Sequence, residues 1–192
     1  MIKYMVCYKR FFLDIDKLLV VSIDIQEGLL KAMPLEIQNL IIRNSKIILK
    51  ACELFKIPVI FTEQYPKGLG QTIPQIKKIV DNFSAIEKIS FSCLKEENFV
   101  KKFNQYKRNQ ILLIGIETHV CIMQTALDLI KRGYYPYIVA DCVASRTKEN
   151  WRIALDQLKE AGAIITTTEI VVFELLKKAG TREFKILSPL IK

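Results

Sequence analysis

Short apolar runs alternate with amphipathic helical segments about six times along the chain, and this alternation limits the possible folds more than any other feature. Alternation of this kind is typical of a parallel sheet covered by helices on both faces. We therefore expect an α/β protein with a doubly wound, Rossmann-like fold of three layers (α/β/α) and a mainly parallel six-stranded sheet of order 3-2-1-4-5-6. The expected strands are 18–23, 57–62, 84–91, 111–114, 135–140 and 163–166. The expected helices are 34–55, a short segment ending near 81, and 94–106, 118–132, 148–161 and 168–178.

No linker, repeat or low-complexity segment divides the 192 residues, and this length suits one domain with a full core. We expect a single domain over 1–192. Residues 1–17 show no clear period and are expected to form an extended arm packed on the domain. Residues 184–191 are expected to form a tail with apolar alternation.

The formal charge of +9 raises the question of a nucleic-acid partner. However, the basic residues are spread along the chain and no run of them exceeds two. Recognition of nucleic acid prefers clustered basic residues interleaved with aromatic ones. We therefore expect no nucleic-acid partner, and we interpret the charge as a solvated surface.

The cysteines are five in number and contain no CxxC pair, which argues against a disulfide framework. A reducing, cytoplasmic location is the simpler interpretation. His119 is the single histidine, so no histidine-rich metal site is expected. No apolar run approaches the roughly 18 residues of a membrane span, so no membrane partner is expected either.

Residues 110–123 read QILLIGIETHVCIM, an apolar strand that runs through a polar kink into a helix. Thr118 is a suitable N-cap, which would place Cys121 in the first helical turn. Free backbone N–H groups and the positive end of the helix dipole favour a thiolate there and could bind an oxyanion. The apolar stripe expected on this helix comprises His119, Met123, Ala126, Leu127 and Ile130.

Two other polar residues are expected to meet Cys121 at the carboxyl edge of the sheet. Asp24 ends the first strand, and Lys88 lies in the third. In this topology the crevice between the first and fourth strands is the usual ligand site. Asp24 could act as the base for the thiol, and Lys88 could tune and position that carboxylate. Attack on a carbonyl would give an oxyanion held by backbone N–H groups of Glu117, Val120 and Cys121, followed by a thioester.

Three motifs carry a resemblance to a known family: VSIDIQ with Asp24, EKISFSC with Lys88 and GIETHVC with Cys121. The chain resembles the isochorismatase-like cysteine hydrolases over nearly everything from Leu18 to Lys192. TEQYPKGLGQT, VADCVASR and the C-terminal tail look especially like the isochorismatase-domain-containing subgroup. The resemblance implies a cis peptide between Ile116 and Glu117, and it suggests a homo-oligomer, either a dimer or a tetramer.

Departures from the family pattern narrow the activity. Nicotinamidases in the family carry an aspartate and histidines for a metal after the second strand, where this chain has FTEQYP. True isochorismatases lack the nucleophilic cysteine. We therefore expect a cofactor-independent hydrolase that cleaves a C–N amide bond of a small metabolite. Alternatives are a non-catalytic binding protein that keeps the fold and a nicotinamidase-type amidase without the usual metal site.

Other polar and thiol groups are assigned more loosely. Asp141 could be structural or catalytic, and a redox thiol protein would require Cys142 within disulfide reach of Cys121. Cys7, Cys52 and Cys93 are interpreted as incidental thiols. The residues expected in the walls of the substrate pocket are Gln26, Gln64, Tyr65, Phe91, Thr118 and His119.

Overall fold

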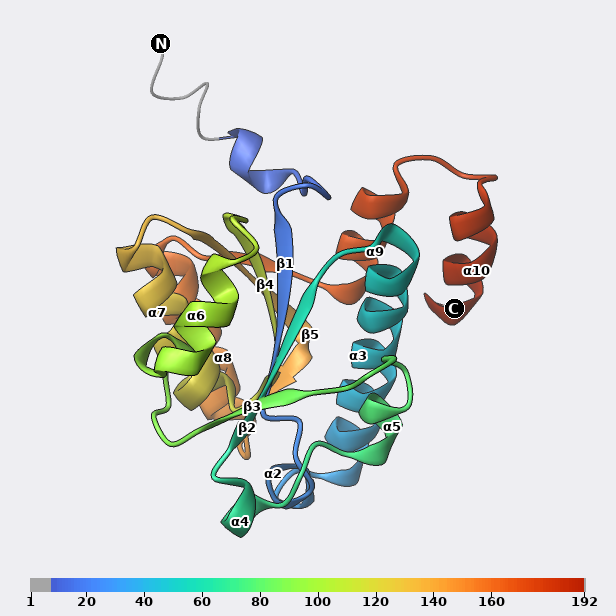
Figure 1. Cartoon of the computed structure of the whole chain (residues 1–192). Coiled ribbons are helices and arrows are strands. Elements are labelled where there is room, and N and C mark those ends of the chain that lie inside the picture. The colour runs from blue at the N-terminus through green and yellow to red at the C-terminus, as the bar shows by residue number, and fades with distance from the viewer. Residues whose placement is uncertain (1–7, 192) are drawn as a thin grey trace.

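A six-stranded, all-parallel sheet forms the centre of the computed structural model, which describes residues 8–191 (Figure 1). The strand order is β3-β2-β1-β4-β5-β6, which confirms the predicted doubly wound topology. The strands are β1 (Leu18–Ile23), β2 (Val59–Gln64), β3 (Ala85–Lys88), β4 (Gln110–Ile116), β5 (Tyr135–Ala144) and β6 (Ile164–Thr166).

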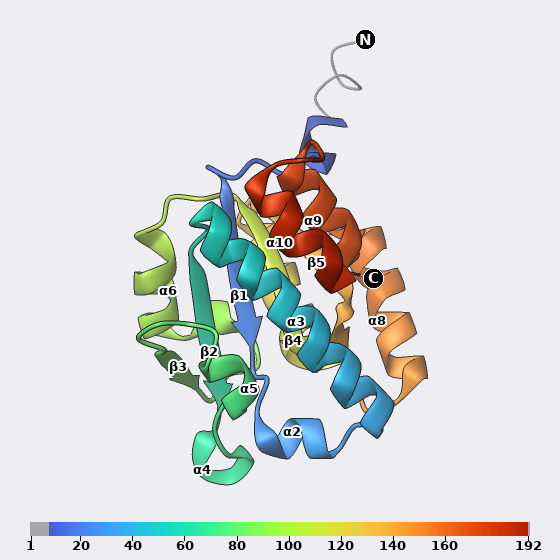
Figure 2. The ribbon, with the colours of Figure 1, turned by 90° about the vertical axis from the view of Figure 1, so that its right-hand side faces the viewer.

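Helices cover both faces of this sheet, as Figures 1 and 2 show from two directions. One face carries α3 (Leu35–Phe55), α9 (Thr168–Leu176) and α10 (Arg182–Ile191). The other carries α6 (Glu97–Asn104), α7 (Met123–Lys131) and α8 (Lys148–Ala161). The short helices are α2 (Glu27–Lys31), α4 (Pro66–Leu69), α5 (Pro74–Lys77), η1 (Tyr8–Phe11), η2 (Cys93–Lys95) and the π-helical turn η3 (Thr118–Ile122).

The central strand β1 divides the core between these two layers. All six of its residues are buried, as expected for a parallel strand covered on both sides. Leu18 and Val20 pack with apolar residues of α3, α9 and α10. Leu19 and Val21 pack with those of α6, α7 and α8. A continuous apolar run is therefore required here instead of an alternating one.

Gly115 lets β1 and β4 approach closely at their carboxyl ends. It lies opposite Ile23 in the parallel register and has a φ of +122°. A Cβ atom at this position would lie 1.9 Å from the Ile23 carbonyl oxygen. Only glycine fits this contact. The next residue after β1 is Asp24, so the close approach sets the distance between the two strand ends that carry the site.

Two predicted segments differ in the structure. The predicted strand 84–91 ends at Lys88, because the N–H groups of Ile89 and Ser90 donate to Glu96 at 3.0 and 2.7 Å instead of continuing a ladder. The predicted tail 184–191 is helical, within α10. Leu187 on that helix is fully buried among residues of α3 and α9, and this packing outweighs the apparent alternation.

The helix after β4 also differs from its prediction. It begins with a π-helical turn in which Ile122 N–H donates to the Glu117 carbonyl at 3.2 Å. The Thr118 hydroxyl has no hydrogen-bond partner among the described residues, so it does not cap the helix. The predicted apolar stripe is confirmed only in part, since Ala126 is buried and Met123 and Ile130 pack against the core, whereas Leu127 is 39% exposed. The buried residues are Thr118, Cys121, Ile122, Thr125, Ala126 and Leu129.

The N-terminal segment is a short helical turn followed by a packed stretch, not an extended arm throughout. After η1, Leu13 is buried in the core on the α3 side. Gln110 fixes the stretch, since its side chain donates to Phe12 O at 2.8 Å and accepts from Asp14 N at 2.7 Å. The prediction for residues 1–7, including Cys7, lies outside the described residues.

Candidate active site

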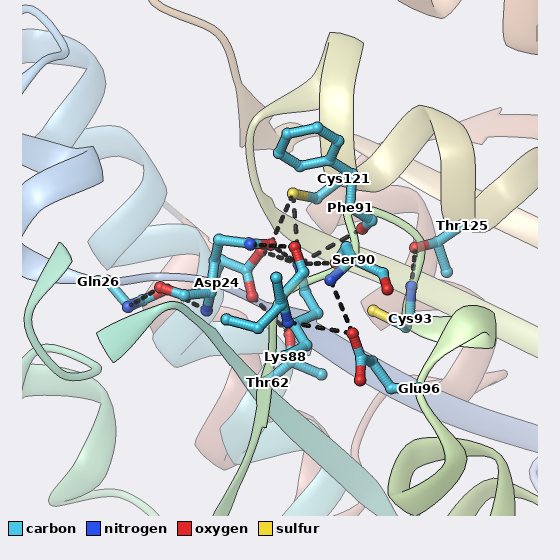
Figure 3. A network of polar contacts seen from close by, with 12 residues as sticks. Asp24, Gln26, Thr62, Lys88, Ser90, Phe91, Cys93, Glu96, Cys121 and Thr125 are labelled. Carbon is cyan, nitrogen blue, oxygen red and sulfur yellow. Dashed lines mark hydrogen bonds and ion pairs between the residues drawn. The ribbon is translucent and has the colours of Figure 1, made fainter. Parts of the chain in front are cut away.

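Asp24, Lys88 and Cys121 come together at the carboxyl edge of the sheet (Figure 3). Asp24 follows β1, Lys88 is the last residue of β3, and Cys121 lies in η3 after β4. Their exposed fractions are 0%, 2% and 5%, respectively. The lysine side chain reaches past β2, which separates β3 from β1. The doubly wound topology therefore brings the three predicted groups to one buried location.

The Lys88 ammonium is the centre of this site. Its Nζ lies 2.7 Å from Asp24 Oδ2 and 3.4 Å from Cys121 Sγ. It also donates to Gln64 Oε1 at 2.5 Å. The remaining acceptors around Nζ are the carbonyl oxygens of Ser90 at 3.3 Å and Phe91 at 3.4 Å. An ammonium group has three protons and no acceptor, so this surrounding favours the charged form.

The Asp24 carboxylate is held on both oxygens. Thr62 Oγ1 donates to Oδ1 at 2.7 Å, while Oδ2 faces Lys88. The Asp24 backbone has a φ of +53°, in the left-handed region that aspartate adopts more readily than most residues do. Gln26 N–H donates to the Asp24 carbonyl at 2.8 Å and closes this turn. The carboxylate is therefore fixed before any ligand binds.

The pKa values of the two charged groups shift upward. Burial raises the pKa of Asp24, and this outweighs the opposing effect of the Lys88 charge and of hydrogen bonds from Lys88, Thr62 and Cys121. For Lys88, burial acts to lower the pKa, but the negative charge of Asp24 outweighs it and the net pKa is raised. Lys88 is therefore an ammonium at neutral pH, and it holds Asp24 as its counter-ion.

The Cys121 thiol behaves differently from its prediction. Burial and the neighbouring Asp24 charge raise its pKa to about 12, against a smaller lowering by Lys88. The expectation that the helix start favours a thiolate is therefore wrong for the resting site, where desolvation dominates. A neutral thiol lies beside an ion pair, so its proton must leave as the sulfur attacks.

The predicted oxyanion donors belong to the turn that carries Cys121. The peptide between Ile116 and Glu117 is cis, at the position that the sequence resemblance implies. Val120 N–H donates to the Glu117 carbonyl at 3.1 Å, so this amide is already used within the turn. Glu117 and Cys121 remain as the predicted donors. The Glu117 side chain accepts from Arg146 N and Nε, each at 3.0 Å.

Two glutamines predicted in the pocket wall instead support the site. Gln64 bonds Lys88 through Oε1 and donates through Nε2 to Ile89 O at 2.7 Å; its Oε1 also lies 3.9 Å from Cys121 Sγ. Gln26 is fully buried and clamps the Gln64 backbone, accepting from its N–H at 2.7 Å and donating to its carbonyl at 2.9 Å. Gln64 therefore touches the reacting groups, and Gln26 fixes Gln64.

The other predicted pocket residues fall into two groups. Tyr65 and Phe91 are half-exposed at this edge, and Tyr65 lines a cavity of about 250 Å³ beside Lys88. Thr118 is fully buried, and its hydroxyl has no partner among the described residues. His119 is half-buried, and its Nδ1 lies 2.9 Å from Ser145 Oγ. Of the six predicted pocket residues, Tyr65 and Phe91 are the exposed ones.

The chain is similar to known proteins over the span that carries these site residues. The family model for the isochorismatase domain matches residues 18–170, a span that contains Asp24, Lys88 and Cys121. The chain belongs to the isochorismatase family. This membership supports a hydrolase in general.

Several isochorismatase relatives are similar over most of their length. Isochorismatase family protein 1A of Dictyostelium discoideum is 42% identical over 79% of this chain and 76% of its own. The secreted isochorismatase effector Isc1 of Phytophthora sojae is 39% identical over 79% and 74%. Isochorismatase domain-containing protein 2 of Danio rerio is 37% identical over 79% and 76%. The last of these supports the predicted subgroup.

Solved structures share the fold. The MAR1 ribonuclease of Caenorhabditis elegans superposes with a TM-score of 0.85 and 32% identity, covering 94% of this chain and 92% of that one. The YcaC protein of Escherichia coli, described as an octameric hydrolase of unknown specificity, has a TM-score of 0.81 at 24% identity, with 87% and 83% covered. The second likeness concerns the fold alone.

Asp141 and Cys142 have structural contacts. Asp141 Oδ1 accepts from Thr168 N at 2.8 Å, and its carbonyl and Oδ2 accept from Asn44 Nδ2, so it ties β5 to α9 and α3. Cys142 is buried in the core on the α3 side of the sheet, whereas Cys121 is in the core on the α7 side. The sheet between them gives no support to a redox pair.

The sequence motifs did not indicate Thr62 or Glu96. Thr62 donates to the Asp24 carboxylate, and Glu96 accepts from the backbone of the loop after Lys88. Thr62 lies at the carboxyl end of a predicted strand beside Asp24's strand, so sheet-edge reasoning could have found it. Glu96 carries no such signal, because its bonds go to the backbone of a loop. Among residues 8–191, no group of three or more His, Cys, Asp or Glu could hold a metal ion, and no helix is long and apolar enough to cross a membrane.

Proposed function

We propose that this isochorismatase-family chain is a cofactor-independent cysteine hydrolase that cleaves a C–N amide bond of a small metabolite. Cys121 is the nucleophile, Asp24 the general base, and Lys88 the cation that orients and tunes Asp24. The observation that carries the proposal is the position of Lys88 Nζ, 2.7 Å from Asp24 Oδ2 and 3.4 Å from Cys121 Sγ. One buried cation thus spans the base and the nucleophile.

The first half-reaction forms a thioester. Sγ attacks the amide carbonyl carbon while its proton passes to the Asp24 carboxylate, since the resting thiol has a pKa of about 12. Backbone N–H groups of Glu117 and Cys121 stabilise the oxyanion. The C–N bond then breaks, and the leaving nitrogen takes the proton from Asp24. Ammonia or an amine departs, and the acyl group stays on sulfur.

The second half-reaction releases the acid. Asp24, again a carboxylate, accepts a proton from water as its oxygen attacks the thioester carbonyl. The tetrahedral intermediate collapses, the C–S bond breaks, and the sulfur recovers its proton from Asp24. Lys88 transfers no proton in either half, because its raised pKa keeps it an ammonium. Its role is to keep Asp24 a charged carboxylate in a buried site.

A small substrate fits the limited access to the sulfur. Cys121 is only 5% exposed, and Asp24 is fully buried. The similarity to MAR1 ribonuclease, together with the charge of +9, makes RNA the second candidate substrate. We favour the metabolite because the sulfur and its base are buried, and we propose a cytoplasmic homo-oligomer without a nucleic-acid partner.

The deciding experiment is a screen of small amides with the wild type, Cys121→Ala and Asp24→Asn, with ammonia release as the readout. We expect Cys121→Ala to abolish turnover and Asp24→Asn to lower kcat by about 10²-fold or more. Intact-protein mass spectrometry should show an acyl adduct on the wild type that Cys121→Ala lacks. Cys52→Ala is the matched control, because Cys52 is a similarly buried thiol on the other side of the sheet.

Two results would contradict the proposal. Turnover by Cys121→Ala at the wild-type rate would exclude the thioester. Cleavage of an RNA oligonucleotide that depends on Cys121, without turnover of any amide, would favour the second candidate.

Size-exclusion chromatography with light scattering tests the proposed oligomeric state. A dimer or a tetramer is expected, and a monomer would contradict this part of the proposal.

A further inference from the structure

The loop between β3 and η2 forms part of the surroundings of Lys88. Ser90 and Phe91 present their carbonyl oxygens to Lys88 Nζ at 3.3 and 3.4 Å. These two residues lie two and three positions after Lys88, so the ammonium folds back onto its own loop (Figure 3). The position of the loop therefore helps to decide where Nζ lies between Asp24 and Cys121.

A single carboxylate oxygen holds two backbone amides of this loop. Glu96 Oε1 accepts from Ile89 N–H at 3.0 Å and from Ser90 N–H at 2.7 Å. Hydrogen bonds to an ionised acceptor are about twice as strong as neutral ones. Gln64 Nε2 fixes the Ile89 carbonyl at 2.7 Å. Gln64 and Lys88 thus hold the carbonyl groups of this loop, and Glu96 holds two of its amide groups.

The Glu96 side chain has no competing role in the helix that follows it. Glu96 is the N-cap position of α6, but it makes no side-chain capping bond. The bond that starts the helix runs from Val100 N–H to the Glu96 backbone carbonyl at 3.0 Å, and any residue can supply that carbonyl. Bonds from the Ser90 and Ile89 amides lower the pKa of Glu96, so it is a carboxylate at neutral pH. Substitution of this side chain therefore acts on the loop and not on a cap.

We propose that Glu96 is a positioning residue for Lys88, acting through the loop Ile89–Phe91. Its carboxylate accepts from the backbone of Ile89 and Ser90, and Lys88 in turn contacts Asp24 and Cys121. Glu96 holds the amides of the loop so that the carbonyls of Ser90 and Phe91 stay against Nζ, which keeps the ammonium between Asp24 and Cys121. Its effect on turnover rests on the proposed hydrolase function, whereas its effect on the loop does not.

Two variants and one control test this role. Glu96→Ala removes both loop bonds, and Glu96→Gln keeps a neutral acceptor oxygen. Glu97→Ala is the control, because Glu97 is the exposed neighbour on the same helix. Small displacements of catalytic groups can lower rates by up to about 10²-fold. We expect Glu96→Ala to lower kcat by about tenfold with KM within about twofold, Glu96→Gln to fall between, and Glu97→Ala to match the wild type.

The loop itself is measured without any substrate. Amide hydrogen exchange at Ile89 and Ser90 should speed up by about tenfold or more in Glu96→Ala, and less in Glu96→Gln. The rate at which iodoacetamide alkylates Cys121 should change in the same order, because Lys88 moves relative to the sulfur. These two readouts stay informative if the wild type hydrolyses no amide, which would contradict the proposed function alone.

Specific outcomes would overturn the inference. If amide exchange at Ile89 and Ser90 is unchanged in a folded Glu96→Ala protein, Glu96 does not hold the loop. If exchange is faster but the alkylation rate of Cys121 is unchanged, the loop does not position Lys88. An equal loss of kcat in Glu97→Ala would show a general effect of α6. If Glu96→Ala fails to fold, Glu96→Gln is the test variant, and wild-type values for all three readouts would reject the role.

Discussion

At the scale of single residues, Asp24 and Lys88 carry the charges of the site as an ion pair, and the Cys121 thiol is neutral. Burial alone would disfavour both charged groups, but each stabilises the other at 2.7 Å. The thiol lacks such a partner of its own, and its pKa rises to about 12. Reactivity therefore depends on Asp24 accepting a proton at the moment of attack, and not on a standing thiolate.

This arrangement predicts how alkylation of Cys121 depends on pH. Only the thiolate reacts, so a pKa of about 12 predicts a rate that rises about tenfold per pH unit from about pH 6 to 9 without a plateau. Lys88→Met removes the cation that lowers this pKa, so the variant should react more slowly at each pH. Peptide mass spectrometry after iodoacetamide treatment measures the rate at each cysteine.

Cys52 is the internal control for this measurement. It is 4% exposed, burial raises its pKa to about 12, and it lies in the core on the other face of the sheet. Its rate should not respond to Lys88→Met. A plateau at Cys121 below about pH 8 would show a resting thiolate and contradict the neutral thiol.

At the scale of elements, periodicity predicted the strands and their order because each buried strand needs a continuous apolar run. The site lies at the carboxyl ends of the strands, so Asp24, Lys88 and Cys121 could be predicted from topology and the family motifs. The π-helical turn before α7 could not, because such a turn is set by local backbone bonds that carry no apolar period. Glu96 accepts from the loop backbone, and this role could not be predicted. Gln64 was predicted only as a pocket residue, because its contacts with Lys88 and the loop appear only once the loop is folded.

Gly115 gives the prediction that belongs to this scale. Gly115→Ala places a Cβ atom 1.9 Å from the Ile23 carbonyl oxygen at a φ of +122°, so β1 and β4 must separate. We expect the free energy of unfolding to fall by at least about 3 kcal/mol, from overpacking and backbone strain together. Urea unfolding measures this, and any folded fraction should lose activity because Asp24 follows Ile23.

Gly133→Ala separates the two contributions. Gly133 also has a positive φ, +82°, but a Cβ atom there would meet nothing within 4 Å. This control should cost only about 1–2 kcal/mol and keep kcat. Equal losses for the two variants would show that the close approach of β1 and β4 has no special importance.

At the scale of the whole molecule, the two faces of the sheet have different roles. The α6, α7 and α8 layer packs around Cys121, whereas the α3, α9 and α10 layer is tied together by buried apolar residues and Asp141. The final helix α10 lies beyond the residues that match the family model. Stability and catalysis should therefore be separable by substitutions on the α10 side.

Leu187→Ala tests this separation. Leu187 is fully buried under α3 and α9, so we expect the free energy of unfolding to fall by about 2–5 kcal/mol. Turnover per folded molecule should stay within about twofold of the wild type. Leu190→Ala is the control, because Leu190 on the same helix is 41% exposed and should change stability by less than about 0.5 kcal/mol. A tenfold loss of kcat in folded Leu187→Ala would mean that the two faces are coupled.

The crowded surroundings of Lys88 also restrict the chemistry that this site can perform on carbonyl compounds. A lysine forms a Schiff base only through its neutral amine, whose lone pair must be free to attack. The Lys88 nitrogen is buried, charged and surrounded by five acceptors from Asp24, Gln64, Ser90, Phe91 and Cys121. Aldehydes and ketones that enter should therefore meet no competing amine, and the sulfur alone should form bonds to carbon.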